Sequence, residues 1–110
     1  MLNQVVLVGR LVKDVEVRTG ENDGKYSFIT LAIPRSYKNH DSVYETDFVE
    51  CVLWNNVASN TAEYCKKGDI VGIKGRIESR KVEENKIKKT VIQVIAEKVT
   101  FLSSKKEDDK

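Results

Sequence analysis

The chain has 110 residues, 40% apolar and 33% charged, which is typical of one globular domain and excludes a disordered or collagen-like chain. Nineteen Lys and Arg residues against 17 Asp and Glu residues give a net charge of +2, so a polyanionic partner requires positive charge gathered on one face. One histidine and two cysteines without a CxxC spacing predict no metal site and no cofactor. With no long apolar run and no secretion signal, we expect a cytoplasmic protein without membrane contacts.

Two segments near the start predict strands. Residues 5–8 are β-branched or leucine and end at Gly9, and residues 15–18 alternate so as to continue the same ribbon beyond a kink. Gly, Asn and Asp residues then gather at 19–25, which predicts a turn.

The next two strands are separated by a polar segment. We expect a strand at residues 26–33 that ends at Pro34, because proline cannot donate a hydrogen bond to a sheet. Residues 35–45 are polar and predict a long, mobile loop. A further strand follows at residues 46–54, with Phe48, Glu50 and Trp54 on one face and Cys51 and Leu53 on the other, where they can serve as core.

One helix is predicted in the second half of the chain. It covers residues 55–67, with Asn55 or Asn56 as its N-cap and Gly68 just beyond its end. Ala58, Ala62 and Cys65 form its apolar stripe.

A hairpin and a tail complete the chain. A strand at 69–80 carries cations on one face, a turn lies near 83–86, and a last strand covers 88–102. Residues 103–110 form a short polar tail. Three strands, one helix and a two-stranded hairpin predict an all-β fold, a five-stranded Greek-key OB-fold barrel with the helix between the third and fourth strands. A ferredoxin-like fold is the alternative, but it needs a second helix that the periodicity does not supply.

Six motifs occur in order along the chain, and each is weak alone. They are residues 3–11 (NQVVLVGRL), 14–18 (DVEVR), 28–32 (FITLA), 46–54 (TDFVECVLW), 62–69 (AEYCKKGD) and 71–76 (VGIKGR). With this set the chain resembles the bacterial single-stranded DNA-binding protein family over residues 1–102. The resemblance implies an OB-fold domain that binds single-stranded DNA without strong sequence preference in replication, recombination or repair. It also implies a homo-oligomer, usually a tetramer, without catalysis, on nucleoid DNA in the bacterial cytoplasm.

The resemblance implies three stacking residues, Tyr37, Phe48 and Trp54. Aromatic rings suit any base, because every base offers a π-face for stacking. The plain alternative, that Phe48 and Trp54 are core residues, is disfavoured because Glu50 shares their face. We expect Tyr26 and Phe28 to be core or sheet residues, with a place for Phe28 at the binding face as the alternative.

Cations near these rings are the candidate phosphate contacts. They are Arg10, Lys13, Arg18, Arg35, Lys38, Lys74, Arg76, Arg80 and Lys81. The expected stripe on the fourth strand is the strongest group, since Lys74, Arg76 and Arg80 alternate on one face.

The chain departs from the family pattern at two places. Val82 stands where the family commonly has an aromatic residue, and Glu83 and Glu84 follow it, which predicts weaker binding. The usual linker and acidic, apolar-ended tip are absent from residues 103–110, so we expect no recruitment of the usual replication partners.

Two other classes of function compete with single-strand binding. An OB-fold adaptor that acts mainly through protein contacts is the alternative function. An enzyme is disfavoured, because the sequence carries no paired-carboxylate signature and no phosphate-cradling glycine loop. RNA is a possible second ligand, since OB grooves accept either nucleic acid.

Overall fold

The computed structural model describes residues 1–104, in which strands predominate. The elements are β1 (Val5–Leu11), β2 (Arg18–Thr19), a short 3-10 turn (Glu21–Asp23), β3 (Lys25–Lys38), β4 (Tyr44–Trp54), α1 (Asn55–Tyr64), β5 (Ile70–Glu84) and β6 (Ile87–Ser103). The predicted tail lies, from residue 105 on, outside the described residues. Among the helices described, none is long and apolar enough to cross a membrane.

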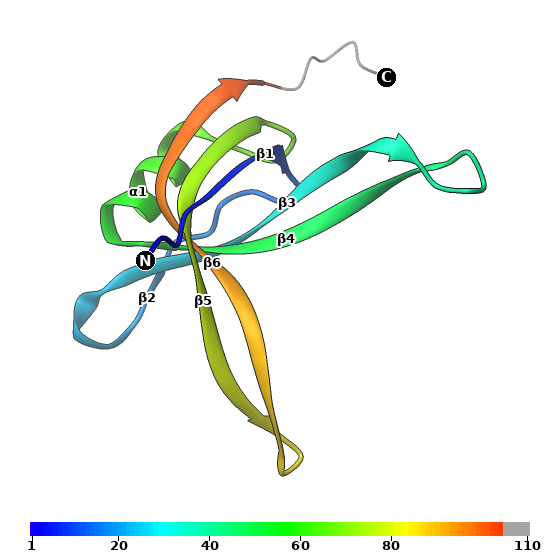
Figure 1. Cartoon of the computed structure of the whole chain (residues 1–110). Coiled ribbons are helices and arrows are strands. Elements are labelled where there is room, and N and C mark those ends of the chain that lie inside the picture. Colours follow the sequence, from blue (N-terminus) through cyan, green and yellow to red (C-terminus); the bar gives the residue numbers. More distant parts are fainter. Residues whose placement is uncertain (105–110) are drawn as a thin grey trace.

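Five long strands close into a barrel. The sheet order is β1-β5-β6-β4-β3-β2 (Figure 1). An additional pairing of β1 with β3, at Arg10–Ala32 and Leu11–Leu31, closes the ring of the five long strands. β4 and β6 run parallel, and the other pairs are antiparallel. Because β2 has only two residues, the predicted strands correspond to β1, β3, β4, β5 and β6. The OB-fold prediction, with one helix between β4 and β5, is confirmed.

The core consists of the inward-facing side chains of these strands. Leu11, Leu31, Leu53 and Ile73 are at most 1% exposed, and Ala58 of α1 packs against them. Successive side chains of a strand point to opposite faces, so the core residues of each strand alternate with residues that face outward.

Both cysteines are free and buried in this core, as predicted. Burial, with a smaller effect from Glu50, raises the pKa of the Cys51 thiol to about 11. Burial also raises the pKa of Cys65. Neither thiol is therefore activated as a nucleophile.

The predicted helix is too long, and its cap is wrong. α1 ends at Tyr64, and Trp54 is its N-cap residue, without a side-chain cap. Asn55 instead adopts a positive φ of 51°, which asparagine tolerates, and its side-chain oxygen accepts a hydrogen bond from the Lys25 N–H at 3.4 Å.

The predicted strand at 15–18 is also mostly wrong. Only Arg18 pairs with β3, through Tyr26. The Asp14 carboxylate accepts a hydrogen bond from the Lys67 N–H at 2.8 Å, which ties this segment to the turn after α1.

Residues 35–45 are not a long loop. β3 continues through Pro34, which pairs with Thr46, and β4 begins at Tyr44. β3 has already passed its last pairing with β1 at Ala32, so only β4 flanks Pro34 and the missing N–H is tolerated there. The turn is ordered by Asn39, whose side-chain oxygen accepts hydrogen bonds from the N–H groups of Asp41 and Val43.

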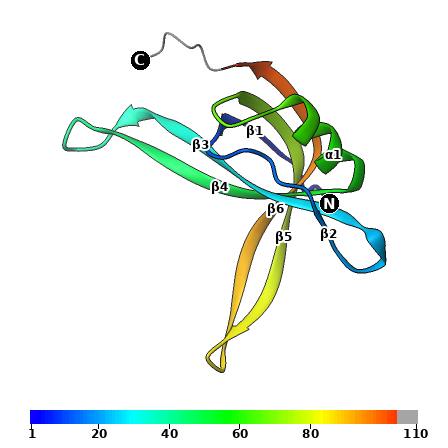
Figure 2. The same cartoon turned by 180° about the vertical axis from the view of Figure 1, so that it is seen from behind.

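Two long hairpins extend from the barrel. The β3–β4 hairpin and the β5–β6 hairpin point in different directions, and the β5–β6 hairpin points away from α1 in both views (Figures 1 and 2). Asn85 and Lys86, both with positive φ, form its two-residue turn, in the predicted place.

Candidate nucleic-acid interface

The outer face of the barrel carries aromatic rings on β3 and β4. Phe48 is 68% exposed and Trp54 is 48% exposed, while Cys51 and Leu53 between them are fully buried on the inner face. Six residues along a strand separate the two rings by roughly 20 Å, enough for several nucleotides. The alternative that these rings belong to the core is therefore wrong.

Phe28 and Tyr26 lie on the same outer face. Tyr26 pairs with Trp54 and Phe28 with Val52 across the two strands. The Tyr26 ring centroid is 5.6 Å from that of Phe28 and 5.8 Å from that of Trp54. Phe28 is half exposed, so the expectation that it is a core residue is wrong, and its place at a binding face stays a prediction.

Phe28 separates three hollows. The first, about 220 Å³, is lined by Lys13 and Arg18 together with the carboxylates of Asp14 and Glu16. The second, about 330 Å³, contains Tyr26, Trp54 and Arg80. The third is about 460 Å³, and we call it the Glu50 hollow; it is lined by Phe28, Glu50, Arg80, Val91, Ile92 and Gln93. Three of the predicted cations, Lys13, Arg18 and Arg80, therefore lie around the ring of Phe28.

The cations of β5 share the outer face as predicted. Arg76 pairs with Ile95, which pairs with Val52, which pairs with Phe28, so these four residues form one line across the sheet. Arg76 is not isolated, however. It forms ion pairs with Glu78, two residues along the strand, and with Glu97 at 3.6 Å.

The other β5 cations differ in their surroundings. Lys74 is exposed on this face opposite Lys98 of β6. Arg80 is exposed, with its Nη1 3.5 Å from Oε1 of Gln93. Lys81, one residue later, projects from the opposite face of β5.

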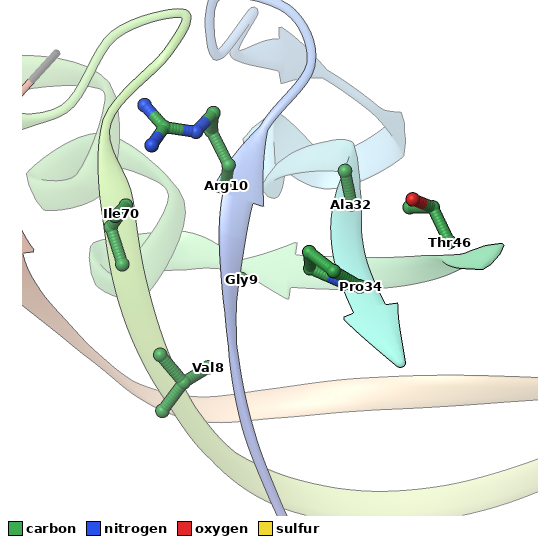
Figure 3. Close-up of a pocket in the computed structure, with 7 residues that line it drawn as sticks. All are labelled: Val8, Gly9, Arg10, Ala32, Pro34, Thr46 and Ile70. Atoms are coloured by element: carbon green, nitrogen blue, oxygen red, sulfur yellow. The ribbon is translucent and has the colours of Figure 1, made fainter. Parts of the chain in front are cut away.

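Arg10 lies in line with Phe48. Arg10 pairs with Ala32 and Ala32 with Phe48, so the three side chains emerge on one face. Together with Pro34, Thr46 and neighbouring residues, Arg10 lines an apolar hollow of about 270 Å³, whose lining residues are drawn in Figure 3. Its Nη1 donates a hydrogen bond to the Gly68 carbonyl at 2.6 Å, which orients the guanidinium toward the start of β5.

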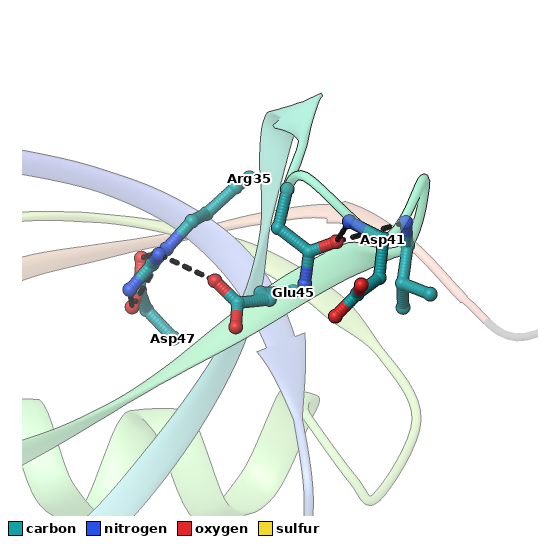
Figure 4. A network of polar contacts seen from close by, with 6 residues as sticks. Arg35, Asp41, Glu45 and Asp47 are labelled. Atoms are coloured by element: carbon teal, nitrogen blue, oxygen red, sulfur yellow. Dashed lines mark hydrogen bonds and ion pairs between the residues drawn. The ribbon is translucent and has the colours of Figure 1, made fainter.

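Arg35 is held by two carboxylates on the β3–β4 hairpin. Its Nη2 donates to Asp47 Oδ1 at 2.9 Å and its Nη1 donates to Glu45 Oε2 at 2.8 Å (Figure 4). The hydrogen bond from Arg35 lowers the pKa of Asp47 below its usual value; burial opposes this shift, and the charge of Arg35 adds to it. The positive charge predicted here is therefore locally neutralised.

The remaining predicted residues are dispersed. Tyr37 is 64% exposed near the end of β3. Lys38 lies with its Nζ 5.4 Å from the centroid of the Tyr44 ring, a cation–π contact. Arg18 is exposed and 3.7 Å from Glu16, an ion pair of the kind that contributes little in water.

Sequence reasoning gave Phe28 a place on this face only as an alternative, and it missed Tyr26 and the buried Gln93 that lines the Glu50 hollow. The signal for the first two was present, because a hairpin that pairs Tyr26 with Trp54 must place them on one side. Gln93 carried no such signal, since its position depends on the parallel pairing of β4 with β6, two elements far apart in the sequence.

Comparison with known proteins agrees with this geometry. Residues 2–102 match the Single-strand binding protein family. The chain is 44% identical over 106 residues to single-stranded DNA-binding protein B of Bacillus subtilis (strain 168), covering 96% of this chain and 94% of that protein. It is 43% identical over 106 residues to single-stranded DNA-binding protein 3 of Listeria innocua, covering 96% of this chain and 66% of that protein.

A third relative differs more in length. The chain is 44% identical over 103 residues to the single-stranded DNA-binding protein of Halalkalibacterium halodurans, covering 93% of this chain and 61% of that protein. The chain thus spans nearly all of the Bacillus subtilis relative but less than two thirds of the other two. An OB-fold barrel, exposed rings on its outer face and a match over almost every described residue lead to one conclusion: the chain belongs to the Single-strand binding protein family.

Proposed function

We propose that this protein binds single-stranded DNA without strong sequence preference, on the outer face of its barrel. The observation that carries the proposal is the exposure of Phe48 and Trp54 on the outer side of a strand whose inner side is sealed in the core. Base stacking on such rings contributes about 1–3 kcal/mol per base and accepts any base. Family membership favours this function over the adaptor alternative.

Cations around the rings would bind the phosphates. Lys13, Arg18, Lys74 and Arg80 lie beside Phe28 or along β5 on the outer face. We propose that Lys13, Lys74 and Arg80, together with Arg10 and Lys38, make the main contacts. The charges of Arg18, Arg35 and Arg76 are offset by nearby carboxylates, and Lys81 faces away, so their contribution is smaller.

Self-association would extend this surface. Within residues 1–104, β1 pairs along one edge with β5, but along the other edge it pairs only at Arg10 and Leu11, with β3. Val6 and Val8 on this strand are 70% and 53% exposed. An unpaired edge with apolar side chains is prone to pair with another chain, which supports a homo-oligomer, with a tetramer as the favoured form.

Replication, recombination and repair are the proposed settings, since each exposes single strands. The relatives named above are bacterial, which supports a place on nucleoid DNA in the bacterial cytoplasm. We propose that this binding involves no catalytic step.

The test is fluorescence anisotropy with labelled oligo-dT. The double variant Phe48→Ala/Trp54→Ala loses two stacking rings, and we expect its affinity to fall at least about 30-fold, since each stacked base is worth about 1 kcal/mol or more. Tyr64→Ala is the matched control, because Tyr64 is 70% exposed but lies on α1. Equal affinities for the two variants would refute the proposed stacking.

A further inference from the structure

A carboxylate lies in the middle of the proposed DNA-binding face. Glu50 is exposed on β4 between Phe48 and Val52, and it lines the Glu50 hollow together with the half-exposed ring of Phe28. A negative charge there repels phosphates. Its position beside a stacking ring instead suits contact with the edge of a base.

Gln93 fixes the geometry of this carboxylate. Gln93 is 8% exposed, and its Nε2 lies 3.5 Å from Oε1 of Glu50, while its Oε1 lies 3.5 Å from Nη1 of Arg80. The buried amide thus links a cation at one side of the hollow to the carboxylate at the other. Within residues 1–104, Oε2 of Glu50 has no hydrogen-bond partner, so it remains available as an acceptor.

The spacing suits a base stacked on Phe28. Glu50 pairs with Thr30, and Phe28 pairs with Val52, so Phe28 and Glu50 are diagonal neighbours on one face. Such neighbours lie about 7–8 Å apart, which lets the edge of a stacked ring reach the carboxylate. Val91 and Ile92 form the apolar wall of the hollow.

We propose that the Glu50 hollow is a base-reading subsite that prefers bases with an exocyclic amino group. A carboxylate accepts a hydrogen bond from the N4 amino group of cytosine, whereas the O4 oxygen of uracil or thymine is itself an acceptor and is repelled. The proposal rests on the proposed function and adds to it a preference at one position. Elsewhere on the face, stacking stays tolerant of sequence.

Oligo-dC and oligo-dU are the sharpest probes, because their bases differ only around position 4. The quantity of interest is the Kd for oligo-dU divided by the Kd for oligo-dC, measured by anisotropy at slightly alkaline pH, where oligo-dC stays single-stranded. Any difference between the free oligonucleotides cancels when this ratio is compared between variants. We expect Glu50→Gln to lower the ratio about fivefold, as the change from a charged to a neutral acceptor in one partly solvated hydrogen bond implies.

Two further variants separate base reading from charge and stacking. Glu83→Gln removes an equal charge from the β5–β6 hairpin outside the hollow, and it should strengthen binding of both oligonucleotides while leaving the ratio unchanged. Phe28→Leu keeps Glu50 but removes the ring, and it should lower the ratio toward that of Glu50→Gln.

The outcomes distinguish the two proposals. Tight binding by every protein with the same ratio in the wild type and Glu50→Gln would overturn the subsite and leave single-strand binding intact. An equal fall of the ratio in Glu83→Gln would also overturn it, because the effect would then be one of general charge. Failure of the wild type to bind either oligonucleotide would overturn both proposals.

Discussion

Removing the two carboxylates that hold Arg35 should release a phosphate contact that the folded protein keeps occupied. The double variant Glu45→Gln/Asp47→Asn preserves the shape of both side chains but removes the acceptors' charges. In the wild type, Arg35 makes a forked contact with Asp47 at 2.9 Å and 3.2 Å and a second contact with Glu45 at 2.8 Å. Because Arg35 lowers the pKa of Asp47, this contact persists further into the acid range than an ordinary aspartate would allow. It weakens only in acid, as Asp47 becomes protonated.

The expected gain follows from counterion release. Each new phosphate contact on a single strand steepens the plot of log affinity against log salt by about 0.7. Lowering the salt fourfold, from roughly 200 mM to 50 mM, should therefore raise the affinity of the variant about 2.6-fold more than that of the wild type. The double variant is expected to gain affinity at low salt, whereas most substitutions in a binding surface weaken binding, so the result is easy to recognise.

The assay is a salt series of anisotropy titrations with labelled oligo-dT. Arg35→Gln in the wild type should leave the slope unchanged, whereas Arg35→Gln added to the double variant should cancel the gain. If Arg35→Gln alone makes the salt dependence shallower by about 0.7, then Arg35 contacts phosphate in the wild type despite its carboxylates. That result would refute the claim that Glu45 and Asp47 keep Arg35 from the DNA.

Four other predictions use a fluorescence titration, single substitutions or a pH series. Saturating oligo-dT should quench the fluorescence of Trp54, the only tryptophan, and unchanged emission would exclude stacking on it. Val6→Lys on the open edge of β1 should lower the molar mass measured by light scattering; an unchanged mass would place the contact between subunits elsewhere. Gly75→Ala should destabilise the fold by more than about 2 kcal/mol in chemical denaturation, because the added Cβ meets the Ile95 carbonyl; a smaller loss would show that β6 can move. Burial raises the pKa of Cys51 from 9.0 to about 11, so stability should fall as the pH rises through this window, and an alanine variant should lose that dependence.

The barrel could be predicted from the sequence because its strands alternate clearly. Leu11, Leu31, Leu53 and Ile73 all face the core, as period-two patterns require. The errors arose where tertiary contacts override local signals. Pro34 stays within β3 because only one neighbouring strand remains at that point, and Asn55 contacts Lys25 instead of capping α1.

The interface could be predicted only in part, for a similar reason. Phe48 and Trp54 stand out because Glu50 shares their face, and their exposure follows from one strand alone. The Glu50 hollow involves β3, β4, β5 and β6 at once, so its lining depends on pairings between strands distant in sequence. Ion pairing of Arg35 likewise depends on the register of the β3–β4 hairpin. That register could not be predicted, because residues 35–45 were expected to form a loop.

The most direct test of the central claim is a competition titration. Labelled oligo-dT bound to the wild-type protein is challenged with unlabelled single-stranded and double-stranded DNA over a series of salt concentrations. Stacking on exposed rings requires unpaired bases, so we predict that single strands displace the label at far lower concentration and that affinity falls steadily with salt. Equal displacement by duplex DNA, or an affinity independent of salt, would contradict the account.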